Sequence, residues 1–340
     1  MTAPIPIEIA GGGLAGLSLG IALRRAGIAV TIFEAGSYPR HRVCGEFITG
    51  LETKTIERLG LGTVLAGALE HREVAWFFGE KRARIQALPS PALGLSRHAL
   101  DARLAALFVA GGGDLRERTR LADLSIRPGR IFATGRRRGD TTWIGLKCHA
   151  RGLELERDLE LHLGDAAYAG LSRVEDGAVN VCGLFRHRPI AARGIDLLCD
   201  YLRASRLTGL EARLRKAELD EESFCAVAAL SFARPRLFPD EIQLGDACGM
   251  MPPFTGNGMA MAFQSAEIAV EPLLAFAHGE RDWSETCRLV NAALHRRFRL
   301  RLASANALHP FLLHPSRQRW LALLNRARLI PFAPLYSVTH

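Results

Sequence analysis

Two groups of residues near the start of the chain have types and spacings that could do chemistry. In the stretch GGGLAG, Gly11, Gly13 and Gly16 have the GxGxxG spacing, and Glu34 follows 18 residues after Gly16. This group is typical of a site for the diphosphate and ribose of a dinucleotide. The stretch PRHRVCGEF then places Cys44, a glycine and a glutamate behind three basic residues. This cysteine could be a ligand, a nucleophile, a redox group or packing, depending on what the first group binds.

The elements around the first group would hold it in place. Alternating isoleucines over residues 5–9 predict a strand, and apolar residues that follow at helical spacing through Leu23 predict a helix that ends at Gly27. The stretch AVTIFE, residues 29–34, predicts a second strand. The segment is therefore predicted to be a βαβ unit.

In such a unit each glycine has a separate task. Gly11 permits the tight turn, Gly13 lets the backbone approach a diphosphate, and Gly16 lets the helix pack closely on the strand. Glu34, at the end of the second strand, would accept hydrogen bonds from a ribose. The helix N-terminus would face the anion. This pattern does not choose between NAD and FAD.

A second helix is predicted from residue 97, with Ser96 as its N-cap and apolar residues along one face. Arg97 stands at its start, where it could face a ligand or only solvent. A third stretch, residues 242–274, begins with a short strand that leads to Asp246. Asp246 could bind ribityl hydroxyls, but on its own a turn or N-cap aspartate would be the simpler interpretation.

After Asp246 a long apolar helix is predicted to open on three residues, Gly256, Asn257 and Gly258. A helix N-terminus offers free N–H groups and partial positive charge. That suits the edge of a flavin ring, where negative charge collects on reduction.

Four stretches together resemble a known family. They are the N-terminal GGGLAG with its glutamate, PRHRVCGEF, LSRHALDARL and GDACGMMPPFTGNGMAMA, and they span nearly the whole chain. In this order they resemble the FAD-dependent oxidoreductases with the para-hydroxybenzoate hydroxylase fold. Within these flavoprotein monooxygenases and their relatives, the geranylgeranyl-reductase-like branch looks most similar.

The resemblance implies a role for each matched position. It implies that Glu34 binds the ribose, that Arg97 flanks FAD, and that Asp246 binds the ribityl chain. It also implies that residues 256–258 lie beside the isoalloxazine ring.

The resemblance places PRHRVCGEF over the flavin, so Arg40 or Arg42 is expected to contact FAD, with Cys44 and Glu46 near the redox centre. Nearby positive charge would lower the pKa of Cys44, and Glu46 would donate a proton or orient a group. The alternative is that Cys44 only packs in a turn and that Glu46 pairs with an arginine.

One departure concerns the electron donor. The family usually carries an Asp-Gly pair that serves FAD and, in the hydroxylases, NADPH, whereas this chain has Thr134-Gly135. NAD(P)H remains the expected donor, but this substitution puts its binding contact in question.

The expected fold class is α/β: a Rossmann-like FAD-binding domain with an inserted β-sheet substrate domain and C-terminal helices. The FAD domain is predicted to be discontinuous. The predicted ranges are 1–74, 96–142 and 240–285 for the FAD domain, 75–95 and 143–239 for the sheet, and 286–340 for the C-terminal helices.

Composition limits the partners. The formal charge is +9, but 40 of the 44 basic residues are arginine, spread along the chain without a nucleic-acid-binding motif. Seven cysteines form no CxxC pair, and the histidines have no metal-ligand spacing, so no metal is expected. No signal peptide or membrane-length apolar run is found, which favours a cytoplasmic protein. The C-terminal helices mix apolar and arginine residues, so peripheral membrane contact is the alternative to simple packing.

Two chemistries fit these features. A monooxygenase would transfer oxygen to an aromatic or polyketide-like ring in secondary metabolism, and a reductase would reduce a carbon–carbon double bond of an isoprenoid. Both substrates are largely apolar. An apolar set of residues near the predicted flavin loop would suit either of them: Met250, Met251, Phe254, Met259 and Met261. A flavin-binding protein with lost catalysis is a third possibility, supported only by Thr134-Gly135.

Overall fold

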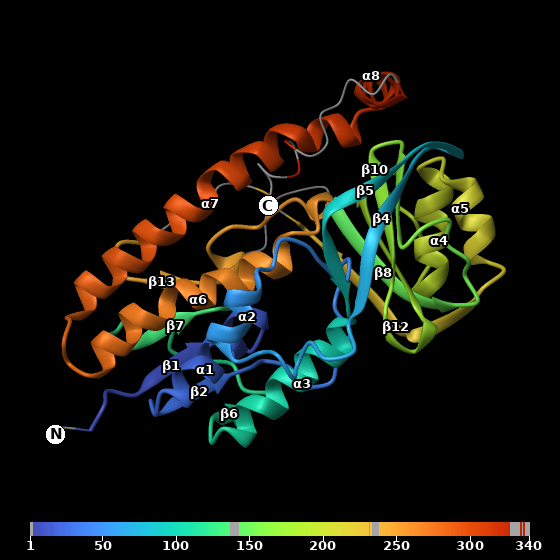
Figure 1. Ribbon diagram of the computed structural model, residues 1–340. Helices are drawn as coiled ribbons and strands as arrows, with labels where there is room; N and C mark the ends of the chain where they lie inside the picture. Colours follow the sequence, from blue (N-terminus) through green and yellow to red (C-terminus); the bar gives the residue numbers. More distant parts are fainter. Residues whose placement is uncertain are drawn as a thin grey trace.

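The α/β fold predicted from the sequence is confirmed by the computed structural model, which describes residues 3–136, 143–230, 232, 238–326, 334 and 336. Figure 1 shows two lobes, each built on one sheet, with a long helix running along the first lobe toward the second.

The first sheet is parallel and has the spatial order β13-β7-β1-β2-β6. Its strands are β1 (Ile7–Ala10), β2 (Val30–Phe33), β6 (Asp114–Arg116), β7 (Arg130–Phe132) and β13 (Ile242–Gln243). The central strand β1 leads directly into α1 (Leu14–Arg25), so the predicted βαβ unit forms the middle of the sheet. Ligands of open α/β sheets bind beyond the carboxyl ends of the strands.

Four more helices belong to this lobe and its surroundings: α2 (Thr53–Leu59), α3 (Arg97–Ala110), α6 (Gly258–Ala277) and α7 (Trp283–Leu313). Helix α6 packs against α1, α2 and α7. By length and composition α6 could cross a membrane, but more than half of its apolar window is buried inside the protein. Helix α6 is therefore a core helix of this lobe.

The second sheet is mixed and has the order β12-β8-β11-β10-β9-β4-β5-β3. Its strands are β3 (Phe47–Ile48), β4 (Leu69–Phe78), β5 (Lys81–Gly94), β8 (Trp143–Arg151), β9 (Leu159–Gly164), β10 (Ala167–Arg173), β11 (Val179–Arg186) and β12 (Glu218–Ala228). Only β4 and β9 pair in parallel among the registered pairs of this sheet. The helices α4 (Gly194–Ala204) and α5 (Thr208–Leu214) pack on its outer face.

The second sheet takes more of the N-terminal half than the predicted ranges allow. Strands β4 and β5 form a long hairpin from residue 69 to 94, and the short strand β3 lies within the range expected for the FAD domain. At the other end, α7 begins at Trp283 and is followed by α8 (Pro315–Arg326). Beyond residue 326, only residues 334 and 336 of the predicted C-terminal helices are described.

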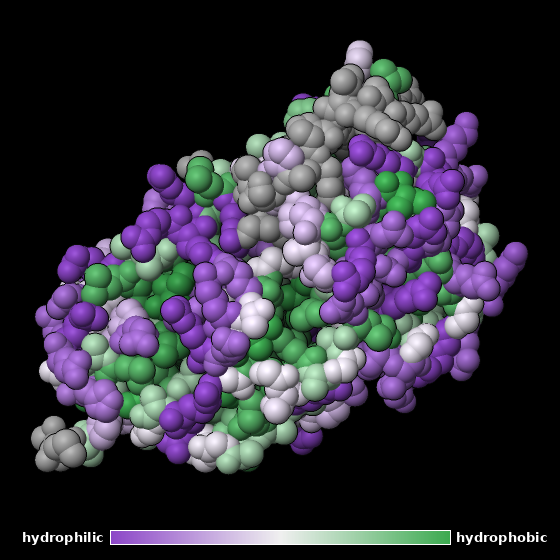
Figure 2. Space-filling model, viewed as in Figure 1, coloured by the Kyte–Doolittle hydropathy of each residue, from purple (hydrophilic) through white to green (hydrophobic). Residues whose placement is uncertain are grey.

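Three short 3₁₀ turns complete the chain: η1 (Glu175–Gly177), η2 (Gly245–Ala247) and η3 (Pro253–Thr255). The turns η2 and η3 lie between β13 and α6, so they stand at the carboxyl edge of the first sheet. Figure 2 shows a hollow between the two lobes, with apolar side chains around it.

Candidate active site

The glycine turn after β1 has the geometry that its spacing predicts. Gly11 has φ +108°, and a Cβ there would lie 2.2 Å from the Ala133 carbonyl oxygen. A Cβ at Gly16 would lie 2.0 Å from the Gly11 oxygen, so α1 packs closely on β1. A Cβ at Gly13 would meet no protein atom within 4 Å. Gly13 therefore faces open space at the N-terminus of α1, where an anion is favoured.

Glu34 follows β2 and is almost fully buried. Its carboxylate accepts hydrogen bonds from Gly12 N–H (2.9 Å), Gly36 N–H (2.8 Å) and Arg40 Nη2 (2.6 Å). Burial alone would raise the pKa of Glu34, but the hydrogen bonds and the charges of Arg40 and Arg42 hold it below its usual value. Glu34 is therefore ionised, and a ribose would have to share this carboxylate with protein donors.

Tyr38 was not expected at this site. Its hydroxyl donates a hydrogen bond to the Gly12 carbonyl oxygen, and burial raises its pKa. Tyr38 thus covers one side of the glycine turn.

Arg42 and Arg97 meet at one carboxylate, that of Asp101. Arg42 Nε donates to Asp101 Oδ2 (2.8 Å), and Arg97 binds both carboxylate oxygens, at 2.7 and 2.9 Å. Asp101 is fully buried. It was missed as a functional residue, although its position four residues after Arg97 is a typical helical ion-pair spacing.

One nitrogen of this cluster has no hydrogen-bond partner. Arg42 Nη2 is buried, lies 3.8 Å from Glu34 Oε2, and makes no hydrogen bond to the described residues. An unsatisfied guanidinium nitrogen is suited to a phosphate oxygen. Arg42 thus has one nitrogen available for the FAD contact that the resemblance implies.

Asp246 lies in η2, and its side chain lines the apolar cavity described below. Nearby protein partly desolvates this carboxylate and raises its pKa, although the side chain stays exposed, while the charges of Arg97, Arg136 and Arg42 oppose that rise. None of the described residues forms a hydrogen bond with Asp246. Its oxygens are therefore able to accept hydrogen bonds from ligand hydroxyls.

The N-terminus of α6 is also open. Gly256 has φ +69°, and Asn257 Nδ2 donates to Thr49 O (3.0 Å) and leaves its buried Oδ1 without a partner among the described residues. No side chain of the described residues caps the helix, and a Cβ at Gly258 would meet nothing within 4 Å. The first N–H groups of α6 are thus free to face a ligand.

The structure corrects the prediction for Cys44. Burial raises the pKa of its thiol and outweighs the opposing charge of Arg97. Basic neighbours were visible in the sequence, but the half-buried position of the thiol was not. Cys44 is therefore a neutral thiol at pH 7, not a thiolate.

The structure also corrects the proton-donor role proposed for Glu46. Its carboxylate accepts hydrogen bonds from His149 Nε2 (2.6 Å) and Arg97 N–H (3.0 Å), and it lies 3.3 Å from Lys147 Nζ. Burial alone would raise the pKa of Glu46, but these partners lower it. The carboxylate is thus ionised near neutral pH and has no proton to give, so only the orienting role remains. Its ion-pair partner is Lys147, and not an arginine as in the alternative interpretation.

His41, half-buried, completes this cluster. The sequence interpretation placed His149 in the sheet as a structural or exposed residue and did not single out His41 or Lys147. His41 Nδ1 accepts a hydrogen bond from Lys147 Nζ (3.0 Å), and burial together with Lys147 lowers its pKa to about 4. Ligand atoms of His41, Glu46 and His149 lie within 4.8 Å of one another, a spacing that could hold a metal ion. Lys147 already supplies a cation there, so the cluster is better described as an ion-pair network.

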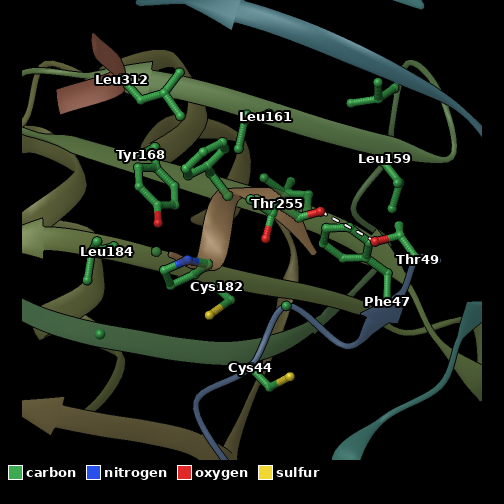
Figure 3. A pocket seen from close by; sticks show the side chains of 18 of the residues that line it. Cys44, Phe47, Thr49, Leu159, Leu161, Tyr168, Cys182, Leu184, Thr255 and Leu312 are labelled. Carbon is green, nitrogen blue, oxygen red and sulfur yellow. Dashed lines mark hydrogen bonds between the residues drawn. The ribbon is translucent and has the colours of Figure 1, made fainter. Parts of the chain in front are cut away.

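An apolar cavity of about 280 Å³ lies between the second sheet, η3 and the end of α7. Figure 3 shows side chains from β9, β10 and β11 pointing into it. Its walls include Trp76, Leu159, Leu161, Tyr168, Leu184 and Leu312. Cys44 and Asp246 also line it. The cavity therefore meets the space at the carboxyl edge of the first sheet, beside Gly13, Arg42 and the N-terminus of α6, which is called the groove below.

Two polar groups in this wall have hydrogen-bonding capacity to spare. Trp76 Nε1 is buried and has no hydrogen-bond partner among the described residues. Tyr168 Oη is buried with the Phe254 backbone as its polar neighbour, and its own O–H has no acceptor among the described residues. Of the apolar set expected near the ligand, Met250 and Phe254 line the cavity, whereas Met251, Met259 and Met261 belong to the core of the first lobe. The cavity thus suits a largely apolar molecule with hydrogen-bond acceptors.

These two sheets, with a glycine-rich turn after β1 and a cavity under the second sheet, form a fold that this chain shares with solved structures, one of them complexed with FAD. No protein-family model matches the chain, and no curated protein matches it in sequence. Solved structures do match, at identities that establish the fold alone.

Three solved structures are similar over nearly the whole chain. PqsL of Pseudomonas aeruginosa in complex with 2-aminobenzoylacetate has a TM-score of 0.71 at 16% identity and covers 92% of this chain and 98% of its own. HpxO of Klebsiella pneumoniae, complexed with FAD and uric acid, has a TM-score of 0.77 at 16% identity, covering 98% and 95%. A geranylgeranyl bacteriochlorophyll reductase-like protein of Thermoplasma acidophilum has a TM-score of 0.74 at 18% identity, covering 94% and 91%.

Proposed function

We propose that the chain is an FAD-dependent monooxygenase that acts on an aromatic or polyketide-like, largely apolar small molecule. One observation carries the proposal: Asp246 and Cys44, from the dinucleotide side, line the same cavity as the apolar wall of the second sheet. A molecule in the cavity would therefore lie next to the reactive end of a bound dinucleotide. The ring compounds in the PqsL and HpxO structures support this substrate class.

The residues present fit FAD. The open space at Gly13 and the N-terminus of α1 would take the diphosphate, and Arg42 Nη2, which makes no hydrogen bond to the described residues, would bind a phosphate oxygen. Glu34 would bind the ribose and Asp246 the ribityl hydroxyls. The uncapped N-terminus of α6 would face the flavin ring. When bound, FAD supplies the electrons for a reaction with molecular oxygen.

The chain's own residues would prepare the substrate. The apolar walls exclude water, and Tyr168 Oη and Trp76 Nε1 can each donate a hydrogen bond to an acceptor on the ring. The turn at Cys44 is held against the sheet, because Asn180 Nδ2 donates to Cys44 O (3.0 Å) and Ser172 Oγ donates to Gly45 O (2.7 Å). This turn would position Cys44 at the boundary between cofactor and substrate.

NAD(P)H is proposed as the electron donor. Thr134 and Gly135 replace the Asp-Gly pair of the resembling family, and residues 137–142 of the same connection lie outside the described residues. Anaerobic mixing with NADH or NADPH would test the donor. Loss of flavin absorbance near 450 nm at a rate that saturates with one of them is the expected result.

The second candidate function is reduction of a carbon–carbon double bond in an isoprenoid. The Cys44-Gly45 pair, which the resembling reductases carry, and the similarity to the reductase-like structure favour it. Both chemistries need the same groove and cavity, so the fold does not separate them.

Oxygen dependence separates the candidates. Chemically reduced holoprotein should be mixed with aromatic polyketides or prenyl lipids under ¹⁸O₂ and under nitrogen. The proposal expects product only in ¹⁸O₂, with one ¹⁸O atom incorporated. Product under nitrogen with a double bond lost would assign the reductase function, and no turnover with any donor would support a flavin-binding protein without catalysis.

A further inference from the structure

The net charge of the protein is confined to one end of the chain. Basic residues are spread throughout, but the acidic residues are not, because no aspartate or glutamate follows Glu285. Residues 1–285 hold 35 basic and 35 acidic residues, whereas residues 286–340 hold nine arginines and no acid. The whole formal charge of +9 therefore belongs to the last 55 residues.

Part of this charge attaches α7 to the first lobe. Arg297 forms an ion pair with Glu52 (2.7 Å), and Arg301 donates to Gln264 Oε1 (2.7 Å). The outer face of α7 carries Arg296 and Arg299, both exposed, and no described carboxylate lies within ion-pair distance of either. This outer face presents positive charge that the protein does not neutralise.

The far end of the same helix pair is apolar and exposed. The apolar tip consists of Phe311, Trp320, Leu323 and Leu324, whose exposed fractions are 45%, 69%, 63% and 39%. Figure 1 shows α8 at the extremity of the molecule, beyond the second sheet. A helix pair with exposed aromatic and leucine side chains beside arginines has the composition of a segment that lies in a membrane interface.

The tip is continuous with the substrate cavity. Phe311 is exposed and also lines the cavity. Leu308 and Leu312 from the same helix line the cavity as well. If the apolar tip were inserted into a membrane, the end of the cavity that Phe311 lines would lie close to the lipid. An apolar molecule could then pass between a lipid phase and the cavity with little exposure to water.

We propose that α7 and α8 bind the surface of a membrane that contains anionic lipid, with the arginine face over the headgroups and the apolar tip inserted among them. The charge supports this partner, because juxtamembrane arginines are attracted by anionic lipid. The apolar tip and its continuity with the cavity distinguish a membrane from a purely electrostatic partner. The inference does not require the proposed reaction.

Vesicle flotation with the full-length protein tests this. Phosphatidylcholine vesicles with and without about 30% phosphatidylglycerol would be used. Wild-type protein should float at least about tenfold more strongly with the anionic vesicles. Arg296→Glu with Arg299→Glu should lower that binding at least about tenfold. A control with the same charge change, Arg118→Glu with Arg120→Glu on the exposed loop after β6, should bind as wild type does.

The apolar contribution has its own readout. Trp320→Ser with Leu323→Ser should lower vesicle binding at least about tenfold even at low salt. Brominated lipid should quench the tryptophan fluorescence of the wild-type protein more than that of the Trp320→Phe variant. Circular dichroism would confirm that each variant is folded. Equal binding to both vesicle types, or wild-type binding by both C-terminal variants, would overturn the proposal. Binding to duplex DNA or an acidic peptide without vesicle binding would also overturn it.

Discussion

Glu46 and Lys147 are both fully buried, and they form an ion pair beneath the turn that carries Cys44. Removing two charges from water costs several kcal/mol each, so such a pair persists only when further hydrogen bonds satisfy it. Here His149 and the Arg97 N–H bind the carboxylate, and His41 accepts from the lysine. The network therefore fixes the turn against the second sheet.

Loss of one member of this pair should be costly. We expect Glu46→Gln to lower the free energy of unfolding by about 3–5 kcal/mol, because Lys147 would remain buried without its counter-charge. Adding Lys147→Met should recover a large part of the loss. Urea denaturation of the two single variants and the double variant measures this. If the double variant lost the sum of the two single effects, the pair would not be coupled.

Cys44 is expected to act as a neutral thiol at the boundary of groove and cavity. Cys44→Ser should retain FAD and slow turnover at least about tenfold, or about 1.4 kcal/mol of barrier. Because burial raises the thiol pKa, the pH profile of turnover from about 6 to 8 should keep its shape in the variant.

Cys225, half-buried on β12 and not among the cavity-lining residues, offers a matched control for Cys44. Cys225→Ser should turn over at the wild-type rate. If Cys44→Ser also turned over at the wild-type rate, Cys44 would have only a packing role.

At the scale of elements, α3 links the two lobes through its N-cap. Ser96 Oγ accepts a hydrogen bond from Ala99 N–H (3.0 Å), and Ser96 N–H donates to Glu175 Oε2 (2.8 Å) in the turn η1. The Ser96 hydroxyl also contacts the Glu175 carboxylate. The helix that holds Arg97 is therefore positioned by Glu175, which lies between β10 and β11 of the second sheet.

Replacing this cap should cost more than replacing an ordinary one. Ser96→Ala is expected to lower the free energy of unfolding by about 2 kcal/mol, since it removes the cap and takes the hydroxyl donor from a part-buried carboxylate oxygen of Glu175. Asp282→Ala removes the N-cap of α7, which binds only Glu285 N–H (2.8 Å), and should cost about 1 kcal/mol. Equal losses in chemical denaturation would contradict the linking role.

The sequence predicts contiguous elements better than long-range partners. The βαβ unit and the roles of Gly11 and Gly16 could be inferred because the strand, turn and helix follow one another within 30 residues. The partnership of Glu46 with Lys147 joins residues 101 positions apart, and only the register of β8 brings them together. The thiolate prediction for Cys44 was wrong for a related reason, since spacing reveals nearby charge but not burial.

At the scale of the whole molecule, α7 joins the lobes. His309, near its end, is buried among Trp143, Tyr168, Phe232 and Phe254. Burial lowers the pKa of His309 to about 4 from an ordinary value of 6.5. The histidine is therefore neutral at the junction between the helix and the cavity wall.

This histidine should make the junction sensitive to acid. In the unfolded chain His309 binds a proton below its ordinary pKa of 6.5, whereas in the folded protein it stays neutral until the pH falls to about 4. Stability is therefore complete above pH 6.5 and falls as the pH drops through this window, by about 3 kcal/mol at most. The free energy of unfolding should fall less steeply from pH 7 to 4 in His309→Leu. Identical slopes would show that His309 is not the group responsible.

The central claim is that the groove above the first sheet binds FAD, and equilibrium FAD binding by paired glycine variants tests it most directly. Gly13 and Gly62 both lack φ in the left-handed region, and a Cβ at either would meet no protein atom within 4 Å. Valine at either position should therefore leave the fold intact, and only at Gly13 should it occupy the diphosphate space. We predict that purified protein releases FAD on denaturation, that Gly13→Val raises the Kd for FAD at least about 100-fold, or about 2.7 kcal/mol, and that Gly62→Val changes it by less than about threefold. Protein that neither releases FAD nor binds added FAD, or a Gly13→Val variant that binds it as tightly as wild type, would contradict the account.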